Sequence, residues 1–158
     1  MVDIVDPATR SRMMAGIRGR NTRPELMLRS ALHRNGRRFR LHDERLPGRP
    51  DIVLPGRRAV ILVHGCFWHR HEGCHWCSTP GSNASFWQKK FDRNVARDYA
   101  QKLALRNLEW RVAVMWECAL RLPWQADSIG TLVNWLDTAE AEFESPLVRR
   151  GKVPDPRT

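Results

Sequence analysis

Metal-binding and proton-transferring side chains are concentrated in one short stretch of the chain. Within fourteen positions lie four of the six histidines and three of the four cysteines: His64, Cys66, His69, His71, Cys74, His75 and Cys77. Thiolates and imidazoles together are the usual ligands of tetrahedral zinc, and histidines outside the metal site can transfer protons near neutral pH. The stretch follows the apolar residues 59–63. This run is too short for a helix and rich in β-branched residues, so it predicts a buried strand. We expect a functional site at the end of this strand.

Five side chains compete for the four positions of a tetrahedral zinc site. Cys66, His71 and Cys74 lie within one tight loop, and Cys118 follows a later apolar run that predicts a strand. Because neighbouring strands lie about 4.8 Å apart, Cys118 can reach the loop if the two strands are close in the sheet. Cys77 is the alternative fourth ligand, since it forms a Cys-x-x-Cys pair with Cys74. Four filled positions would make the zinc structural, because a catalytic zinc keeps one position open.

A second apolar run begins with a carboxylate. Three apolar residues follow Asp51, and a Pro-Gly turn leads back to residues 59–63, so the two runs predict an antiparallel hairpin. In such a hairpin Asp51 lies beside Val63 and His64. A carboxylate near strand-end carbonyls is an oxygen site that suits Mg²⁺. With His64 and His69 to manage protons, the combination suits hydrolysis of a phosphodiester.

The charge of the chain favours a polyanionic partner. Its 158 residues contain 27 Lys and Arg against 17 Asp and Glu, a net charge of +10, and 23 of the basic residues are Arg. Arginine binds phosphate in a bidentate manner, so nucleic acid is the natural partner. An arginine-rich host composition would produce the same excess, so charge alone does not decide the function.

Length and hydropathy indicate one globular domain. No apolar stretch approaches the roughly 20 residues that span a bilayer, and the N-terminus has no export signal. We therefore expect a cytoplasmic protein, in which cysteines are not read as a disulfide framework.

Periodicity and capping signals define the elements that must position these residues. Asp6-Pro7 opens one helix, and a capping box of Thr22 and Glu25 opens the next, so capping alone accounts for Glu25. Ser128 is expected to cap the last helix. The order is helix, helix, three strands, helix, strand, helix: residues 7–18, 22–35, 38–41, 51–54, 59–63, 85–103, 110–116 and 128–136. This order predicts an α/β fold, a small mixed sheet with helices on its faces.

Aromatic residues accompany the expected ligands. Phe67 and Trp68 lie in a loop that cannot easily bury both rings, and Trp87 is at the start of the long helix. On a basic protein such rings can stack on bases or wedge between them. Ordinary core packing is the alternative, above all for Trp87.

Together these motifs resemble the very-short-patch-repair DNA mismatch endonucleases. The matching segments are Leu46-Pro-Gly-Arg-Pro-Asp51, His64-Gly-Cys-Phe-Trp-His69, His71-Glu-Gly-Cys74, Phe86-Trp87 with Asn94 and Arg97-Asp98, and Trp110-Arg-Val through Trp116-Glu-Cys118. The likeness covers about residues 3–122. It implies a restriction-endonuclease-like fold related to the PD-(D/E)XK nucleases. It also implies Mg²⁺-dependent nicking of one strand 5′ to the thymine of a T:G mismatch, which arises by deamination of 5-methylcytosine.

The resemblance also assigns roles to residues. Asp51 and the main-chain carbonyl of Val63 would hold Mg²⁺, His69 would be the general base and His64 would assist at the phosphate. Many relatives carry Thr where this chain has Val63, but a carbonyl ligand does not depend on the side chain. The zinc ligands would be Cys66, His71, Cys74 and Cys118, and Cys77 has no role in the family. The wedge beside the mismatch would comprise Phe67, Trp68 and Trp87, with Met14 inserted from the opposite groove.

We therefore expect a single endonuclease domain over residues 1–144, with a DNA-contacting arm at residues 1–20 and a disordered tail at residues 145–158. The expected partner is double-stranded DNA with a T:G mismatch, bound by a monomer; contact with mismatch-repair proteins is left open. Two alternatives are a zinc-stapled DNA-binding module without catalysis and a restriction-type nuclease with another specificity.

Overall fold

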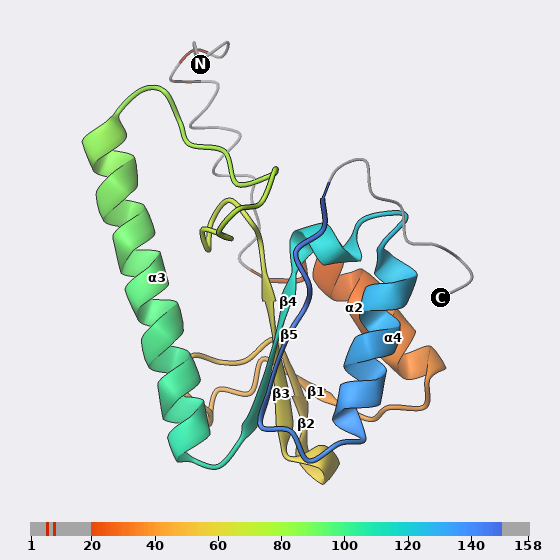
Figure 1. Ribbon diagram of the computed structural model, residues 1–158. Coiled ribbons are helices and arrows are strands. Elements are labelled where there is room, and N and C mark those ends of the chain that lie inside the picture. Colours follow the sequence, from red (N-terminus) through yellow and green to blue (C-terminus); the bar gives the residue numbers. More distant parts are fainter. Residues whose placement is uncertain (1–5, 7, 9–19, 150–158) are drawn as a thin grey trace.

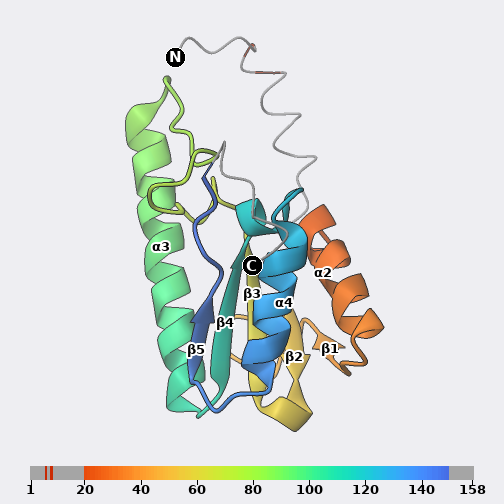
Figure 2. The same ribbon diagram turned by 45° about the vertical axis from the view of Figure 1, so that its right-hand side comes forward.

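A five-stranded mixed sheet with strand order β1-β2-β3-β4-β5 forms the centre of the molecule. The structure is a computed structural model that describes residues 6, 8 and 20–149. The long helix α3 (Ala84–Asn107) covers one face, and α2 (Arg23–Arg34) and α4 (Gln125–Leu136) cover the other (Figures 1 and 2). Apart from residue 8, the helix expected at residues 7–18, including Met14, lies outside the described residues. No helix in the described part of the chain is long and apolar enough to cross a membrane.

The predicted hairpin is confirmed. Strands β2 (Ile52–Leu54) and β3 (Ala59–His64) pair antiparallel, with Ile52 opposite Ile61, and a 3-10 turn at Pro55–Arg57 joins them. Strand β3 is buried on both faces of the sheet, which is why its sequence is a continuous apolar run. The short strand β1 (Arg40–Leu41) pairs with β2 at the sheet edge.

Strand β4 (Arg111–Trp116) pairs parallel with β3, with Trp116 beside His64. The carboxyl ends of both strands therefore meet at one edge of the sheet, where a 3-10 turn at Glu117–Leu120 follows β4. This pairing brings the residues after Trp116 to the loop after His64.

Strand β5 (Glu142–Glu144) pairs parallel with β4 and was not expected from the sequence. It has three residues with a single apolar side chain, too short a pattern to predict a strand. Beyond it, Ser145 Oγ accepts a hydrogen bond from Trp116 N at 2.9 Å, and the Val148 side chain is buried in the core. The packed domain thus continues past residue 144, the boundary expected from the sequence; residues 150–158 lie outside the described residues.

The capping of two helices differs from the expectation. Helix α4 begins at Gln125 rather than after Ser128, whose side chain is buried in the first turn. The prediction of Ser128 as the cap is wrong, because backbone bonds from the preceding turn start the helix: Gln125 N donates to Arg121 O. At α2, Thr22 Oγ1 accepts from Glu25 N at 3.5 Å, as expected, but the Glu25 carboxylate accepts from Asn21 N rather than Thr22 N.

The inner face of α3 is more polar than its sequence suggests. Trp87 and Phe91 are buried, but the following apolar residues at i+4 spacing, Val95, Tyr99 and Leu103, are exposed. Each step of four residues turns the ridge by about 40° around the helix axis, so the ridge leaves the protein interior. Polar residues take the place of the ridge on the inner face of α3. They are Asn94, Asp98 and Gln101, and they line a cleft.

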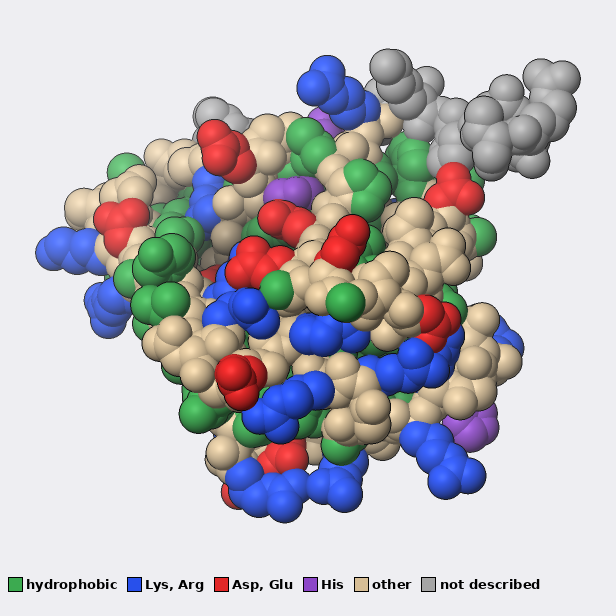
Figure 3. All heavy atoms as spheres, turned by 60° about the horizontal axis from the view of Figure 1, so that its bottom comes forward, with side chains coloured by type: hydrophobic (Ala, Val, Ile, Leu, Met, Phe, Trp, Pro, Cys, Tyr) green, Lys and Arg blue, Asp and Glu red, His purple; other side chains and the backbone are tan. Residues whose placement is uncertain are grey.

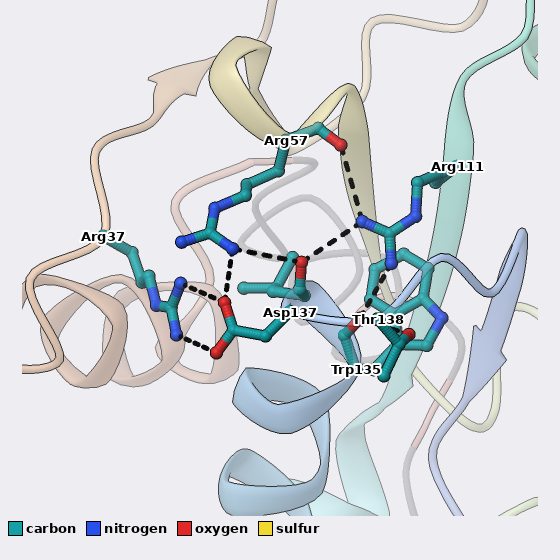
Figure 4. Close-up of polar contacts among 7 residues, drawn as sticks. Arg37, Arg57, Arg111, Trp135, Asp137 and Thr138 are labelled. Carbon is teal, nitrogen blue, oxygen red and sulfur yellow. Dashed lines mark hydrogen bonds and ion pairs between the residues drawn. The ribbon is translucent and has the colours of Figure 1, made fainter.

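The end of the sheet away from these strand termini is held by arginines. Asp137, after α4, accepts from Arg37 at 2.9 and 2.8 Å and from Arg57 in the β2–β3 turn (Figure 4). Arg111 lies 4.2 Å from the Trp135 ring and donates to the Trp135 carbonyl at 2.7 Å. Figure 3 turns this end toward the viewer and shows Lys and Arg side chains spread over it.

Candidate active site and metal centre

A cleft of about 1190 Å³ opens at the carboxyl end of β3. The start of α2, the loop before β2, the end of β3 and the inner face of α3 all contribute to its walls. The lining includes Glu25, His42, Asp51, Val63, His64, Trp68, His69, Asn94, Asp98 and Gln101. The three residues expected from the sequence to be catalytic, Asp51, His64 and His69, therefore share one cleft.

Asp51 is fixed by the hairpin in the predicted place. Its Oδ2 accepts a hydrogen bond from Val63 N at 2.8 Å. Burial raises the pKa of Asp51 to about 6, although the bond from Val63 lowers it. Asp51 thus carries a largely buried carboxyl group whose negative charge lacks full compensation, as expected of a cation ligand.

His64 and His69 lie face to face. Their ring centroids are 4.0 Å apart and the rings are nearly parallel, at 3°. Burial lowers the pKa of His64 to about 3, so this imidazole is neutral at physiological pH. The stacked pair presents one neutral imidazole and one partly exposed imidazole to the cleft.

Asp98 on α3 orients His69. His69 Nδ1 lies 2.5 Å from Asp98 Oδ2. Because a carboxylate only accepts hydrogen bonds, His69 donates from Nδ1, and in the neutral imidazole Nε2 then carries the lone pair. Asp98 belongs to one of the motifs that resemble the family, but no role for it follows from the sequence, because no spacing pattern pairs it with a histidine 29 positions away.

A second cluster lies beside this site. The ligand atoms of Cys66, His71, Cys74 and Cys118 all lie within 4.8 Å of one another, and all four residues are buried. Cys118 Sγ is 3.4 Å from His71 Nδ1, and Cys66 Sγ is 3.7 Å from the same atom. Ligands at about 2.0–2.3 Å from one tetrahedral ion would have similar separations, so the four residues fit such an ion. Cys77 is outside this group and partly exposed.

Electrostatics favour a thiolate in this cluster. A hydrogen bond with Cys66 is the main cause that lowers the pKa of Cys118 to about 6. Because metals bind the deprotonated sulfur, such a group is prepared for a cation. The parallel pairing of β3 and β4 brings Cys118 to the loop.

Comparison with known proteins identifies the family of the chain. Residues 2–76 match a sequence profile described as DNA mismatch endonuclease Vsr. The chain is 50% identical over 120 residues to the type II nicking enzyme V.XorIIP of Xanthomonas oryzae pv. oryzae, covering 76% of this chain and 88% of that protein. It is 46% identical over 121 residues to the DNA mismatch endonuclease Vsr of Escherichia coli, covering 77% of each. The chain belongs to the Vsr DNA mismatch endonuclease family. The resemblance seen in its motifs is thereby confirmed.

The aromatic residues of this Vsr family member form a packed group beside the cleft. The Phe67 ring contacts those of Trp68, Trp87 and Phe91, with centroids 5.0, 5.6 and 5.3 Å away. Trp87 is 7% exposed and packs as a core residue, whereas its neighbour Phe86 is 58% exposed. Trp68 lines the cleft, with Lys90 Nζ 5.3 Å from its ring centroid.

Glu25 contributes to the cleft of this Vsr family member as well as to capping. It is 2% exposed, and its carboxylate accepts from Asn21 N at 3.0 Å and Thr22 Oγ1 at 3.2 Å. Its ligand atom and those of His42 and Asp51 lie within 4.8 Å of one another. Explaining Glu25 by capping alone was incomplete, because the first turn of α2 forms one wall of the cleft.

Gly48 fixes the loop that precedes Asp51. Its φ is +70°, and a Cβ there would collide with the Gln101 side chain of α3. Glycine adopts this conformation without strain, and its lack of a Cβ leaves room for the Gln101 side chain against the loop. This contact holds the segment that carries Asp51 against the helix that carries Asp98.

Proposed function

We propose that this chain nicks one strand of duplex DNA 5′ to the thymine of a T:G mismatch, with Mg²⁺ as catalytic metal and structural zinc. Family membership supports the reaction class, since the relatives are described as a mismatch endonuclease and nicking enzymes. The observation that carries the proposal is the meeting of Asp51, His64 and the His69–Asp98 pair in one cleft. The mixed α/β sheet is compatible with a restriction-endonuclease-like fold.

Asp51 and the main-chain carbonyl of Val63 would hold the Mg²⁺ ion. When bound, this ion supplies positive charge that stabilises the phosphate during displacement. His69 Nε2 accepts a proton from the attacking water, and Asp98 stabilises the resulting imidazolium through Nδ1. His64, which is neutral, donates a hydrogen bond to a phosphate oxygen. The water oxygen forms a new bond to phosphorus, the bond from phosphorus to the sugar oxygen breaks, and the leaving oxygen takes up a proton from solvent; one such event cuts one strand.

Zinc at Cys66, His71, Cys74 and Cys118 would have no open position and would therefore be structural. It would join the loop that carries His69 to the turn after β4. We expect Cys118→Ser to lose zinc and to unfold at a lower temperature. Cys77→Ser should keep its zinc and its unfolding temperature. Metal analysis and thermal unfolding measure this; equal loss in both variants would return Cys77 to the ligand set.

DNA binding is supported by charge and by the exposed rings. Four basic residues line the same cleft as the catalytic residues and can contact phosphates: Arg20, Arg49, Lys90 and Arg97. Trp68 and the exposed Phe86 would supply stacking surface near the mismatch, with Phe67 and Trp87 packed behind them. One chain supplies every residue of this arrangement, which agrees with action as a monomer.

A nicking assay on matched and T:G duplexes tests the proposal, with and without Mg²⁺. We expect Mg²⁺-dependent cleavage of one strand of the T:G duplex only. Equal cleavage of both duplexes would indicate a restriction-type nuclease, and binding without cleavage would indicate an inert DNA-binding module. A variant outside the catalytic residues should nick normally: Asp92→Asn removes an exposed carboxylate from α3, the helix that also carries Asp98.

A further inference from the structure

Arg29 contacts two residues of the cleft wall at once. Its Nη2 lies 3.0 Å from Glu25 Oε2 and 3.0 Å from His42 Nε2. The Arg29 side chain is 13% exposed, and that of His42 is 16% exposed, so the contact is largely shielded from water. Glu25 already accepts hydrogen bonds from Asn21 N and Thr22 Oγ1, so capping does not require this guanidinium.

The contact determines the state of His42. A guanidinium nitrogen can only donate, so His42 Nε2 must accept and the imidazole carries its proton on Nδ1. Burial lowers the pKa of His42, in agreement with a neutral ring. Each ring nitrogen that accepts has one lone pair, and Arg29 occupies the lone pair of Nε2.

Without Arg29 this wall would be a different metal site. Glu25, His42 and Asp51 offer two carboxylates and one imidazole, with ligand atoms within 4.8 Å of one another. Imidazole ligands favour Zn²⁺, Co²⁺ or Ni²⁺, whereas Mg²⁺ prefers oxygen ligands and water. The positive charge of Arg29 also opposes a second cation close to Asp51.

We propose that Arg29 is a metal-selectivity residue that keeps His42 and one oxygen of Glu25 from binding a transition metal in the cleft. The cleft then offers Mg²⁺ only the oxygen ligands around Asp51. Arg29 does not touch the substrate; it acts through His42 and Glu25. This inference rests on the proposed function in that Asp51 is taken as the Mg²⁺ ligand.

The test is Co²⁺ binding to the untagged, zinc-loaded protein, measured by titration calorimetry and visible absorption. Arg29→Met keeps the apolar stem and removes the guanidinium. We expect this variant to bind one additional equivalent of Co²⁺. The dissociation constant of this equivalent should be at least about tenfold below that of any Co²⁺ bound at the same wall in the unaltered chain. The additional binding should disappear in the double variant Arg29→Met/His42→Gln. Arg29→Lys, which keeps the charge and the donor, should behave as the unaltered chain.

The matched control is Arg34→Met on the same helix. The Arg34 side chain is exposed and makes no hydrogen bond or ion pair with another residue in the described ranges. This variant should bind no additional Co²⁺. An equal stoichiometry and affinity in Arg29→Met and the unaltered chain would overturn the proposal.

A further measurement does not depend on the folding of Arg29→Met. His42→Gln alone should leave Co²⁺ binding unchanged, because Arg29 already occupies the imidazole lone pair; a loss of binding would overturn the proposal. Failure of the proposed function has a different signature. In that case Asp51→Asn would bind Mn²⁺, used as a probe for Mg²⁺, as tightly as the unaltered chain.

Discussion

Two aspartates at opposite ends of the sheet show how one residue type serves two purposes. Asp137 is half exposed, and its hydrogen bonds from Arg37 are the main cause that lowers its pKa to about 2 (Figure 4). Asp51 is largely buried, accepts from the main-chain N–H of Val63, and burial raises its pKa to about 6. The first carboxylate is compensated by two cations of the protein, and the second is not.

The difference separates stabilisation from function. The contacts of two arginines with Asp137 join the segment after α2 (Arg37) and the β2–β3 turn (Arg57) to the end of α4, so these charges are used within the fold. The charge of Asp51 is neutralised fully only when a cation binds. Burial of this charge lowers the stability of the folded chain. Substitutions at the two aspartates should therefore have opposite consequences.

Asp51→Asn is the largest perturbation. We expect nicking to fall by roughly 10³-fold or more, because loss of a metal ligand removes several kcal/mol of transition-state stabilisation. The same variant should be more stable at pH 7 in Mg²⁺-free buffer. In the folded unaltered chain the raised pKa of Asp51 favours the protonated carboxyl. The unaltered chain is therefore most stable below pH about 4 and loses this stability as pH rises through about 6, whereas the Asn side chain does not ionise. Over about two pH units this amounts to about 3 kcal/mol, which denaturant unfolding can measure. A less stable Asn variant would contradict this account.

Asp98→Asn tests the support behind the site. The amide can donate to His69 Nδ1, which would favour the tautomer with the proton on Nε2 and block the base. We expect a loss of about 10²-fold or more in single-turnover nicking, with little change in DNA affinity. Asp92→Asn on the same helix is the control and should change neither quantity. Equal losses in affinity and rate would assign Asp98 to DNA binding instead.

The sequence predicted the parts of the site that adjacent strands determine. Asp51 and Val63 meet because a Pro-Gly turn joins two β-branched runs in a fixed register, and Cys118 reaches the cysteine loop because β4 pairs with β3. The first inference needs only strand periodicity and the turn, whereas the second was conditional on β4 lying next to β3, which the structure shows.

The contacts between helices, loops and the sheet could not be predicted in this way. Asp98 faces the cleft because the apolar ridge of α3 turns outward, and that turn depends on how the helix packs. His42 meets Arg29 through a loop in which His42 has a φ of +46°. Neither residue has a sequence spacing typical of a site, so the side chains that support the chemistry emerge only from the tertiary structure.

The pH dependence of Mg²⁺ affinity sharpens the comparison. A proton and Mg²⁺ compete for Asp51, whose pKa is raised to about 6, so apparent affinity should fall by about tenfold per pH unit below that value. Nicking rates against Mg²⁺ concentration, from about pH 5 to about pH 8, measure it. Saturating Mg²⁺ should restore much of the rate, because the metal displaces the proton. An affinity that stays constant over this range would show that Asp51 is already ionised at low pH.

Asp137→Asn should have the smallest effect on nicking and the opposite sign for stability. The site lies at the far end of the sheet, so the nicking rate should stay within about twofold of the unaltered chain. The lowered pKa means that Asp137 stabilises the fold above pH about 4 and loses this contribution as pH falls through about 2. The variant should therefore unfold at a lower temperature at pH 7, and the difference should shrink in acid. Asp92→Asn, whose carboxylate has no arginine partner in the described part of the chain, should show neither change. A large loss of nicking in Asp137→Asn would mean that the two ends of the sheet are coupled, and the separation between stabilising and functional carboxylates would fail.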